Sequence, residues 1–435
     1  MRTYWCERAW LPTGPARAVA ITVDGDRIAT VVPDVDRTGT VLNGLVMPGF
    51  ANVHSHAFHR ALRGRTHHAG GSFWTWRKQM YVATERLDPD SYYRLARAVY
   101  AEMVLAGFTG VGEFHYLHHA PGGVPYADPN SMSHALVAAA QDAGIRLTLL
   151  DTCYLTGGFD DELDPVQRRF SDRNADRWAA RVASFRPASP RALVGAAVHS
   201  VRAVPAEQIP TVVTWAGQRG AVLHAHVSEQ RAENDACLSV HGRTPIELLA
   251  DSGALDGDFV AVHATHLTPT DIDRLGSARS GVCFCPTTER DLGDGIGPAR
   301  GVADAGARLS LGSDSQAVID PFEEIRGLEM DERLARQARG QFTTVELVAA
   351  ATRHAAIGWH GVGAIEAGGF ADLVAVALDS VRTAGSDSAG IPFCANGSDV
   401  RDVIIGGEWV VRDGRHQRIA DPARVLAEEV PELYG

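Results

Sequence analysis

Eight short apolar segments, each ending in or beside a polar residue, constrain the fold of this chain more than any other sequence feature. They are Gly44–His54, Phe108–Phe114, Arg146–Asp151, Leu193–His199, Ala221–His226, Phe259–His263, Gly281–Pro286 and Ala307–Asp314. Helix-like stretches rich in alanine, leucine and arginine, such as 91–106 and 131–143, lie between them. Apolar strands that alternate with helices indicate a parallel sheet buried on both faces. Eight such units predict an α/β protein built on a (β/α)8 barrel of the TIM type.

The two ends of the chain have a different pattern. Ala18–Val32 and Val403–Val411 are rich in strand-forming residues and contain the turn signals DGD and GGE, and Asp372–Leu378 is a further strand candidate. We expect both ends to pair into one small, discontinuous β-sandwich. The predicted division is 1–45 and 366–435 for the sandwich and 46–365 for the barrel.

Composition excludes several classes of protein. The formal net charge of −12 argues against binding to a nucleic-acid backbone, which requires a basic surface. No stretch of about 18 apolar residues is present, and the first residues lack the apolar core of a signal peptide. Six cysteines in a chain of this length do not suggest a disulfide framework, and none lies in a CxxC pair, so a reducing compartment is expected. These features predict a cytoplasmic protein that binds neither nucleic acid nor membrane.

Ionisable residues are concentrated at the carboxyl ends of the predicted strands, where barrel enzymes place their catalytic groups. A barrel with only a structural role has no reason to carry so many charged groups there. The sequence therefore predicts an enzyme with its active site at this end. The residues are His54, His56, Glu113, His115, Asp151, His199, His226, Glu229, His263 and Asp314.

Three histidines and a carboxylate in this set suit a divalent-metal site. His54 and His56 are two residues apart on one strand and therefore point to the same side. Together with a further histidine and Asp314, they can hold a zinc-type ion and leave a position for water. The ion lowers the pKa of that water and so supplies a hydroxide nucleophile. Glu229 is placed to shuttle protons, and Asp314 can both bind the metal and accept the proton of the water.

Two choices between neighbouring histidines remain open from spacing alone. His224 and His226 face the same side of one strand, and we prefer His226 because it begins an HxxE step at the strand end. His263 follows the apolar run VAV directly, so we place it at the strand end and His266 in the loop beyond. His118 and His119 have no assigned role.

The motifs HSH after MPGF, HVSE, VHATH and LGSD occur in an order that resembles the amidohydrolase superfamily, in particular its deaminase branch. Some members of the superfamily bind two metals bridged by a carbamylated lysine on the fourth strand. The corresponding segment, Leu193–His199, has no lysine. The resemblance therefore implies a single divalent ion per subunit, with zinc as the default and iron or manganese as alternatives.

Longer motifs resemble one family of that branch, the formimidoylglutamate deiminases. They are HSHAF, SFWTWR at 72–77, GEFHYLHH at 112–119, VHSVRAVP at 198–205 and CPTTERDLGDG at 285–295, and the similarity runs over roughly residues 44–380. This family hydrolyses N-formimidoyl-L-glutamate to N-formyl-L-glutamate and ammonia in one route of histidine degradation. The resemblance implies that activity, a homodimer and a small dicarboxylate as the substrate.

The resemblance also implies a role for each residue that matches a motif. The metal ligands would be His54, His56, His226 and Asp314, and the groups acting in catalysis would be Glu229, His263 and Asp314. Substrate binding would involve His59, Arg77, Tyr116, His199 and Arg202. Two arginines suit a substrate with two carboxylates, since a guanidinium group binds a carboxylate in bidentate fashion. His59 stands where many members of the family have glutamine, so it bears on substrate selectivity.

Three other functions are compatible with parts of the sequence. A nucleobase or nucleoside deaminase of the same superfamily shares the metal site, but its pocket would need groups that stack on a ring. A hydrolase of a guanidino monocarboxylate is chemically closer. A barrel retained as a non-catalytic scaffold would tend to lose metal ligands, whereas here every expected position is filled.

Overall fold

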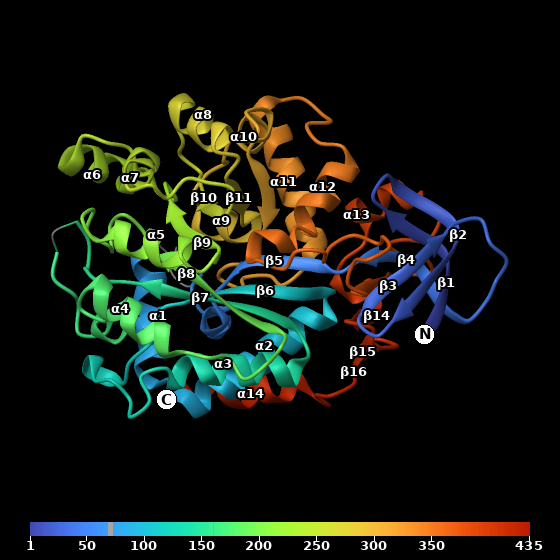
Figure 1. Ribbon diagram of the computed structural model, residues 1–435, viewed down its shortest axis with the longest axis horizontal. Helices are drawn as coiled ribbons and strands as arrows, with labels where there is room; N and C mark the ends of the chain where they lie inside the picture. The colour runs from blue at the N-terminus through green and yellow to red at the C-terminus, as the bar shows by residue number, and fades with distance from the viewer. Residues whose placement is uncertain (68–72, 160) are drawn as a thin grey trace.

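The chain forms two eight-stranded sheets, one of them a parallel barrel (Figure 1). The structure is a computed structural model that describes residues 1–67, 73–159 and 161–435. The barrel strands are β5 (Phe50–Ser55), β6 (Phe108–His115), β7 (Arg146–Cys153), β8 (Ala192–Val198), β9 (Leu223–Val227), β10 (Phe259–His263), β11 (Gly281–Phe284) and β12 (Arg308–Leu311). They pair in sequence order, so the predicted (β/α)8 barrel is confirmed.

One predicted strand is divided between the two sheets. The segment predicted as a single strand from Gly44 to His54 forms the end of β4 (Thr40–Pro48), in the second sheet, and β5, in the barrel. The division falls at Gly49, where a Cβ atom would lie 2.2 Å from the Thr109 hydroxyl and where the backbone N–H donates to Asp372 O. Continuous hydrophobicity concealed this change of sheet, because strands in both sheets are buried.

Contacts between the first and last strands close the barrel. Ser55 forms a parallel bridge with Asp314, the Asp314 N–H donates to His54 O at 3.0 Å, and the His56 N–H donates to Asp314 O at 3.1 Å. Gly312 allows this approach, because a Cβ atom there would lie 2.8 Å from His54 O and 2.9 Å from His54 N. Closure therefore brings residues 260 positions apart in sequence to one place.

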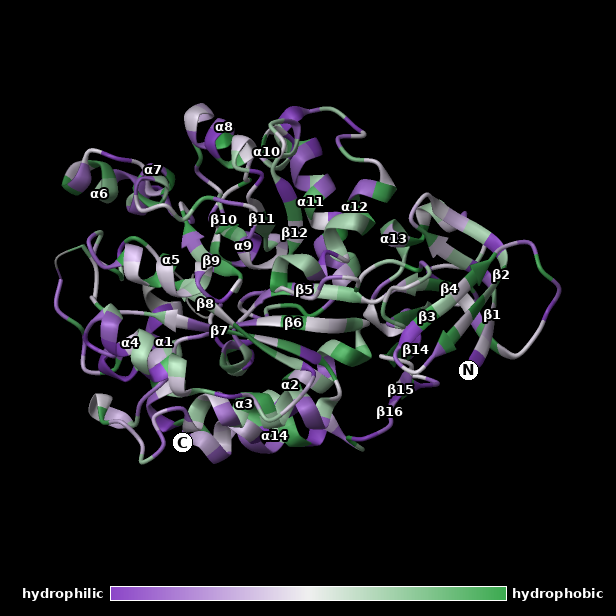
Figure 2. Cartoon of the chain, viewed as in Figure 1, coloured by the Kyte–Doolittle hydropathy of each residue, from purple (hydrophilic) through white to green (hydrophobic). Residues whose placement is uncertain are grey.

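Helices surround the barrel and bury its outer face. The helices on the barrel side are α1 (Phe73–Arg86), α2 (Pro89–Leu105), α3 (Ser131–Ala143), α4 (Ala175–Ser184), α5 (Ile209–Gly217), α6 (Arg231–His241), α7 (Pro245–Asp251), α8 (Pro269–Ser277), α9 (Pro286–Leu292), α10 (Ala299–Asp304), α11 (Pro321–Arg336) and α12 (Thr344–Ala351). They are followed by α13 (Ile391–Cys394) and α14 (Pro422–Glu432). In Figure 2 the surrounding helices carry both green and purple residues, and the barrel strands alternate green stretches with white and purple ones.

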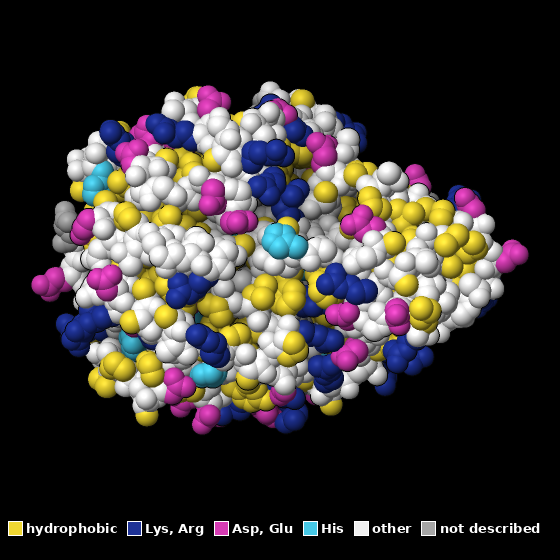
Figure 3. Space-filling model, viewed as in Figure 1, with side chains coloured by type: hydrophobic (Ala, Val, Ile, Leu, Met, Phe, Trp, Pro, Cys, Tyr) yellow, Lys and Arg dark blue, Asp and Glu magenta, His cyan; other side chains and the backbone are white. Residues whose placement is uncertain are grey.

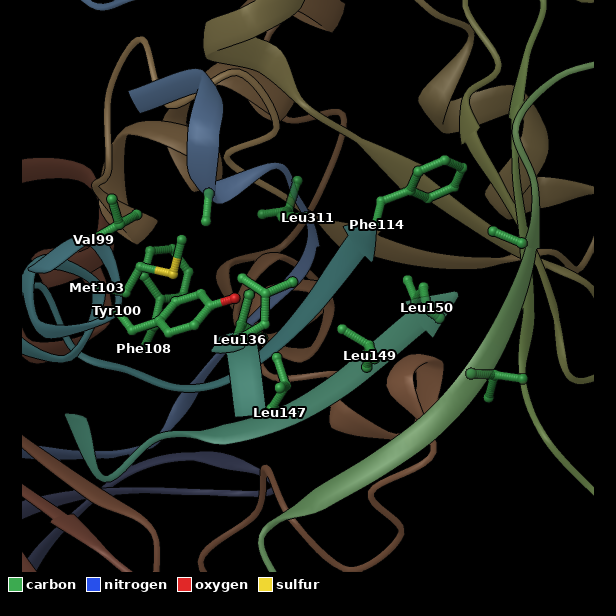
Figure 4. Packing of buried hydrophobic residues seen from close by; sticks show 14 of the residues in the cluster. Val99, Tyr100, Met103, Phe108, Phe114, Leu136, Leu147, Leu149, Leu150 and Leu311 are labelled. Atoms are coloured by element: carbon green, nitrogen blue, oxygen red, sulfur yellow. The ribbon is translucent and has the colours of Figure 1, made fainter. Parts of the chain in front are cut away.

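Helix ends and core contacts follow from local sequence. Capping boxes begin α2, α7, α8 and α12, where an Asp or Thr side chain accepts from a backbone N–H three residues on. Tyr100 and Met103 of α2 and Leu136 of α3 pack near Phe108 and Leu147 of the barrel (Figure 4). The apolar stripes of these helices thus cover the outward side of β6 and β7.

The second sheet combines both ends of the chain, as predicted. Its strands are β1 (Arg2–Leu11), β2 (Gly14–Asp24), β3 (Arg27–Val32) and β4 from the first part, and β13 (Leu373–Val376), β14 (Val400–Ile405), β15 (Glu408–Arg412) and β16 (Arg415–His416) from the last. Tyr4 of β1 and Trp409 of β15 are four strands apart, or about 19 Å in a flat sheet. Their ring centroids are 6.0 Å apart. The sheet therefore folds over its own core, which gives the predicted sandwich from one hydrogen-bonded sheet.

A buried ion pair joins this sheet to the barrel. Arg146, at the start of β7, donates two hydrogen bonds of 2.9 Å to the carboxylate of Asp372. The Gly406 N–H donates to the same carboxylate, and the guanidinium group lies over the rings of Phe370 and Trp359. Removal of either charge would leave the other buried and unpaired, which is costly.

The described surface carries charges of both signs. On the face drawn in Figure 3, basic and acidic side chains are interspersed and do not form a continuous basic area. In the described part of the chain, no helix has the length and apolar character needed to cross a membrane. All six cysteines carry free thiols.

Substitution of Gly312 by alanine tests the closure of the barrel. We expect Gly312→Ala to lower the free energy of unfolding by about 1–3 kcal/mol, because the added methyl group would displace the backbone of His54. Gly301→Ala is the control, since Gly301 lies in α10 with no atom nearer than 3.7 Å to the added carbon. Urea unfolding of both variants measures the effect. Equal unfolding midpoints would contradict this role of Gly312.

Candidate active site

The barrel gathers three imidazoles and a carboxylate at the carboxyl ends of its strands. His226 Nε2 lies 3.1 Å from His54 Nε2 and 3.3 Å from His56 Nε2. Asp314 Oδ1 lies 3.2 Å from His54 Nε2 and 3.3 Å from His56 Nε2. Two ligands that are each ~2.1 Å from one ion at a tetrahedral angle are about 3.4 Å apart. These four distances therefore match those between ligands of one ion. His54, His226, His263 and Asp314 also lie close enough to one another to hold an ion, and so do His56, His59 and Asp314.

Hydrogen bonds at the far side of two rings decide which ring nitrogens face this centre. His56 Nδ1 lies 2.9 Å from Phe114 O, and His226 Nδ1 lies 2.9 Å from His199 O. Because a carbonyl oxygen only accepts, each Nδ1 carries the proton, and each neutral ring presents a lone pair on Nε2. Two lone pairs and a carboxylate oxygen repel one another at these distances unless a cation lies between them. The donor set thus fits a divalent ion.

The electrostatics of the cluster point the same way. Burial lowers the pKa of His56 and of His226 well below the ordinary value, and neighbouring imidazoles lower both further. Burial alone would raise the pKa of Asp314, but the hydrogen bond with His54 and the charges of the histidines lower it. Neutral imidazoles beside an ionised carboxylate are the protonation states that metal ligation requires.

The two oxygens of Asp314 face different neighbours. Oδ1 faces His54 and His56, whereas Oδ2 lies 3.8 Å from His263 Nε2. His263 Nε2 is also 3.9 Å from Glu229 Oε1, and its Nδ1 is 3.4 Å from Glu289 Oε1. Oδ1 is thus the oxygen nearer to His54 and His56, and Oδ2 is the oxygen nearer to His263.

His263 and Asp314 are both held in a left-handed backbone conformation, with φ of +67° and +42°. Such conformations are unfavourable for residues other than glycine and persist where the surrounding structure enforces them. Here the hydrogen bonds between Asp314 and the β5 end supply that restraint for one of the two residues.

His263 is the one histidine of this group whose charged form is favoured. Burial acts against the charge, but Glu229, Glu289 and Asp314 together raise the pKa of His263 well above the ordinary value. Glu289 also accepts from the Cys285 N–H at 2.8 Å, which fixes its position at the start of α9.

All five residues expected to bind substrate line one pocket beside the cluster. They are His59, Arg77, Tyr116, His199 and Arg202, and the same pocket is lined by His56, His226, Glu229, His263 and Asp314. His59 Nε2 and the Tyr116 hydroxyl are 2.9 Å apart, and burial lowers the pKa of His59 to about 3. His54 lies beneath the pocket and is fully buried.

The two arginines line the pocket from different elements, and each pairs with a different carboxylate. Arg77, on α1, donates from Nε to the Tyr81 hydroxyl at 2.6 Å and pairs with the exposed Asp164 at 3.4 Å. Arg202, which follows β8, lies 3.5 Å from the buried Glu233. The motif that includes Arg77 begins at Ser72, which lies outside the described residues.

The structure separates the histidines that sequence spacing left in competition. His224 lies deeper in the barrel, where Nε2 donates to Ala356 O at 2.8 Å. His266 Nε2 contacts Asp294 O at 2.8 Å, away from the cluster. His118 Nε2 contacts Thr152 O, and His119 Nε2 lies 3.0 Å from Asp172. His226 and His263 are the members of their pairs that reach the cluster.

Sequence reasoning did not identify three residues that shape the site. Glu289 lies within the motif CPTTERDLGDG at 285–295, but no role was predicted for it. Tyr154 follows β7 directly, so its position next to a strand end is the signal that could have found it. Glu113 was noted only as a strand-end charge; it accepts from the Ala57 N–H at 2.7 Å and from the Ser55 hydroxyl at 2.9 Å. These donors flank His56, so Glu113 holds the end of β5 in place.

Comparison with known proteins identifies the family. A family model described as the amidohydrolase family matches residues 45–410. The chain belongs to the amidohydrolase family. This confirms the resemblance drawn from the short motifs and the prediction of a hydrolase of this type.

Similar proteins cover the whole amidohydrolase chain. Formimidoylglutamate deiminase from Pseudomonas aeruginosa strain PAO1 is 36% identical over 100% of both chains. A 5-methylthioadenosine/S-adenosylhomocysteine deaminase from Natronomonas pharaonis is 30% identical and covers 96% of this chain and 90% of its own length. The crystal structure of an amidohydrolase from Brucella melitensis is 30% identical over 100% of both chains, with a TM-score of 0.90.

Substitution of Glu113 tests its hold on the end of β5 in this amidohydrolase. Glu113→Ala leaves the Ala57 N–H and the Ser55 hydroxyl without their acceptor, and we expect a loss of about 2–4 kcal/mol in unfolding free energy together with reduced metal content. Glu113→Gln keeps an oxygen for the Ala57 N–H and should retain most of both. Chemical unfolding and metal analysis measure the two effects. Wild-type metal content in the alanine variant would show that β5 holds its position without Glu113.

Proposed function

We propose that this chain hydrolyses N-formimidoyl-L-glutamate to N-formyl-L-glutamate and ammonia. In this reaction water adds to the C=N carbon, the new C–O bond becomes the formyl group, and the terminal nitrogen leaves as ammonia. The observation that carries the proposal is the presence of two arginines and a cluster of metal-binding side chains in one pocket. The similarity over the full length to a formimidoylglutamate deiminase supports the same substrate.

The proposed metal ligands are His54, His56, His226 and Asp314 Oδ1. A divalent ion held by these residues would lower the pKa of a water molecule towards neutrality and so supply the nucleophile. We propose zinc, because three imidazoles and a carboxylate are a usual donor set for it, with iron and manganese as alternatives.

The remaining carboxylates and His263 are proposed to move protons. Asp314 Oδ2, which faces away from His54 and His56, takes a proton from the attacking water. Glu229, whose Oε1 lies 3.9 Å from the same His263 Nε2, delivers a proton to the nitrogen that leaves. His263, with Nδ1 directed to Glu289, donates from Nε2 and orients the formimidoyl group.

Substrate recognition is proposed to rest on charge and on polar groups in the same pocket. Arg77 and Arg202 bind the two carboxylates, since planar guanidinium groups match carboxylates in geometry. His59, Tyr116 and His199 complete the polar wall beside the metal ligands. His59 and Tyr116 contact each other, so a change at either one alters both.

One observation favours a second candidate, the deamination of a nucleoside or nucleobase. Trp76, Tyr81, Tyr116, Tyr154 and Phe170 also line the pocket and offer aromatic surface for a ring. One relative is named as a deaminase of 5-methylthioadenosine and S-adenosylhomocysteine. Two arginines in the pocket favour the dicarboxylate over these neutral ring systems.

The biological setting belongs to the same proposal. We propose a role in histidine degradation, a cytoplasmic location and a homodimer, all from the resemblance to the deiminase family. Light scattering on the purified chain measures the oligomeric state directly.

A substrate comparison tests the proposed reaction. Ammonia release is measured with N-formimidoyl-L-glutamate, N-formimidoyl-L-aspartate, a guanidino monocarboxylate, adenosine and guanine. We expect the highest kcat/KM for formimidoylglutamate and a lower value for the shorter aspartate compound, because its carboxylates lie one methylene closer together. Release of ammonia from a nucleoside or from guanine, with none from formimidoylglutamate, would assign the pocket to the second candidate.

Substitution of the arginines tests the recognition of the carboxylates. We expect Arg77→Met to lower kcat/KM for formimidoylglutamate, by an amount that corresponds to about 2–4 kcal/mol of activation free energy. Most of the loss should appear as a higher KM. Arg202→Met also leaves the buried Glu233 unpaired, so the matched variant is Arg202→Met with Glu233→Gln. Wild-type kcat/KM in both variants would refute this assignment.

A further inference from the structure

Tyr154 occupies the pocket wall directly after β7. Its side chain is 8% exposed, and its ring centroid lies 4.4 Å from that of His199 and 5.4 Å from that of Phe170. The residue lines the same pocket as Arg77 and Arg202. Its ring is therefore fixed by packing, and only the direction of the hydroxyl proton remains to be assigned.

Gln167 decides that direction. The Asp164 N–H donates to Gln167 Oε1 at 2.8 Å, which identifies this atom as the oxygen of the amide. The amide nitrogen of Gln167 then donates to the Tyr154 hydroxyl oxygen at 2.7 Å. Gln167 is 1% exposed, so water cannot readily replace either contact.

The hydroxyl proton of Tyr154 must therefore point elsewhere. The oxygen accepts from Gln167, and a hydroxyl group has one proton to donate. Within the described ranges, the Tyr154 hydroxyl is hydrogen-bonded to Gln167 and to no acceptor. The side of the hydroxyl that remains is the pocket, so the proton is available to a bound molecule.

Charges of both signs act on this hydroxyl group. Burial raises the pKa of Tyr154 and the charge of Asp164 adds to that rise, whereas the charges of Arg202 and of Arg77 act against it. The hydroxyl of Tyr81, to which Arg77 donates, also interacts with Tyr154. Donors and positive charges thus converge at this end of the pocket.

We propose that Tyr154 is a substrate-binding residue that donates a hydrogen bond to one of the two carboxylates bound by Arg77 and Arg202, and that Gln167 is a positioning residue that keeps the hydroxyl proton directed into the pocket. The proposal rests on the proposed function, because it concerns the same substrate and the same pocket.

This arrangement selects for an acceptor. A carboxylate only accepts hydrogen bonds, so it can be bound by the hydroxyl and by an arginine at once. An amino group in the same position would face only donors. Gln167 thus contributes to specificity without touching the substrate.

Removal of the hydroxyl tests the first part of the proposal. We expect Tyr154→Phe to lower kcat/KM for N-formimidoyl-L-glutamate about 10- to 100-fold, mainly through KM, because a hydrogen bond to a charged group is lost. The control Tyr93→Phe removes a hydroxyl bonded to Asp142 on the surface and should leave both constants unchanged. A Tyr154→Phe variant within about twofold of wild type would overturn the proposal.

Reversal of the amide tests the second part. In Gln167→Glu one carboxylate oxygen still accepts from the Asp164 N–H, but the other now accepts the Tyr154 proton and withdraws it from the pocket. We expect KM to rise as in Tyr154→Phe. We also expect kcat/KM of the double variant to be no lower than that of the more impaired single variant. Gln417→Glu, at an exposed position, adds the same charge as a control. Independent, additive losses would overturn the positioning role of Gln167.

Two analogues identify which carboxylate Tyr154 contacts. One is 4-formimidoylaminobutyrate, which lacks the α-carboxylate, and the other is 2-formimidoylaminobutyrate, which lacks the γ-carboxylate. We expect the penalty of Tyr154→Phe to vanish for one of them, measured as kcat/KM or as an inhibition constant. A penalty equal for all three compounds would overturn the proposal. Failure of the wild-type chain to act on formimidoylglutamate would instead refute the proposed function itself.

Discussion

Repulsion between buried lone pairs is the constraint on which the rest of this structure depends. His56 and His226 each use Nδ1 to reach a carbonyl oxygen, so both turn Nε2 towards the other and towards Asp314. Such a group is stable away from water only with a cation at its centre, or with protons that burial disfavours. The carbonyl oxygens of Phe114 and His199 thus fix which ring nitrogen His56 and His226 present to the cluster.

The contacts that close the barrel also position the side chains of the candidate site. The bridge between Ser55 and Asp314 joins the first and last strands, and the same backbone places Asp314 beside His54 and His56. Glu113 braces the β5 end from outside the pocket, and Gly312 admits the close backbone approach from within. A change that loosens closure therefore affects stability and the ligand cluster together.

The sequence predicted the barrel well because strand ends repeat in a regular order. Apolar runs that end at His54, His226 or His263 predict both the barrel strands and the location of the site. They can be recognised in the sequence without knowledge of tertiary contacts. The division of Gly44–His54 between two sheets could not be read, because strands in both sheets are equally apolar. The position of Tyr154 beside a strand end was a usable signal, but its hydrogen bond with Gln167 and the contact of Glu289 with His263 could not be predicted from sequence spacing.

The most direct test of this account is the metal content of the purified chain and of two variants on the same strand. His224 and His226 face one side of β9, but only His226 reaches the cluster. We predict about one divalent ion per chain in the wild type and in His224→Gln, and clearly less in His226→Gln. A wild-type chain that is active without a stoichiometric ion, or loss of the ion in His224→Gln but not in His226→Gln, would contradict the account.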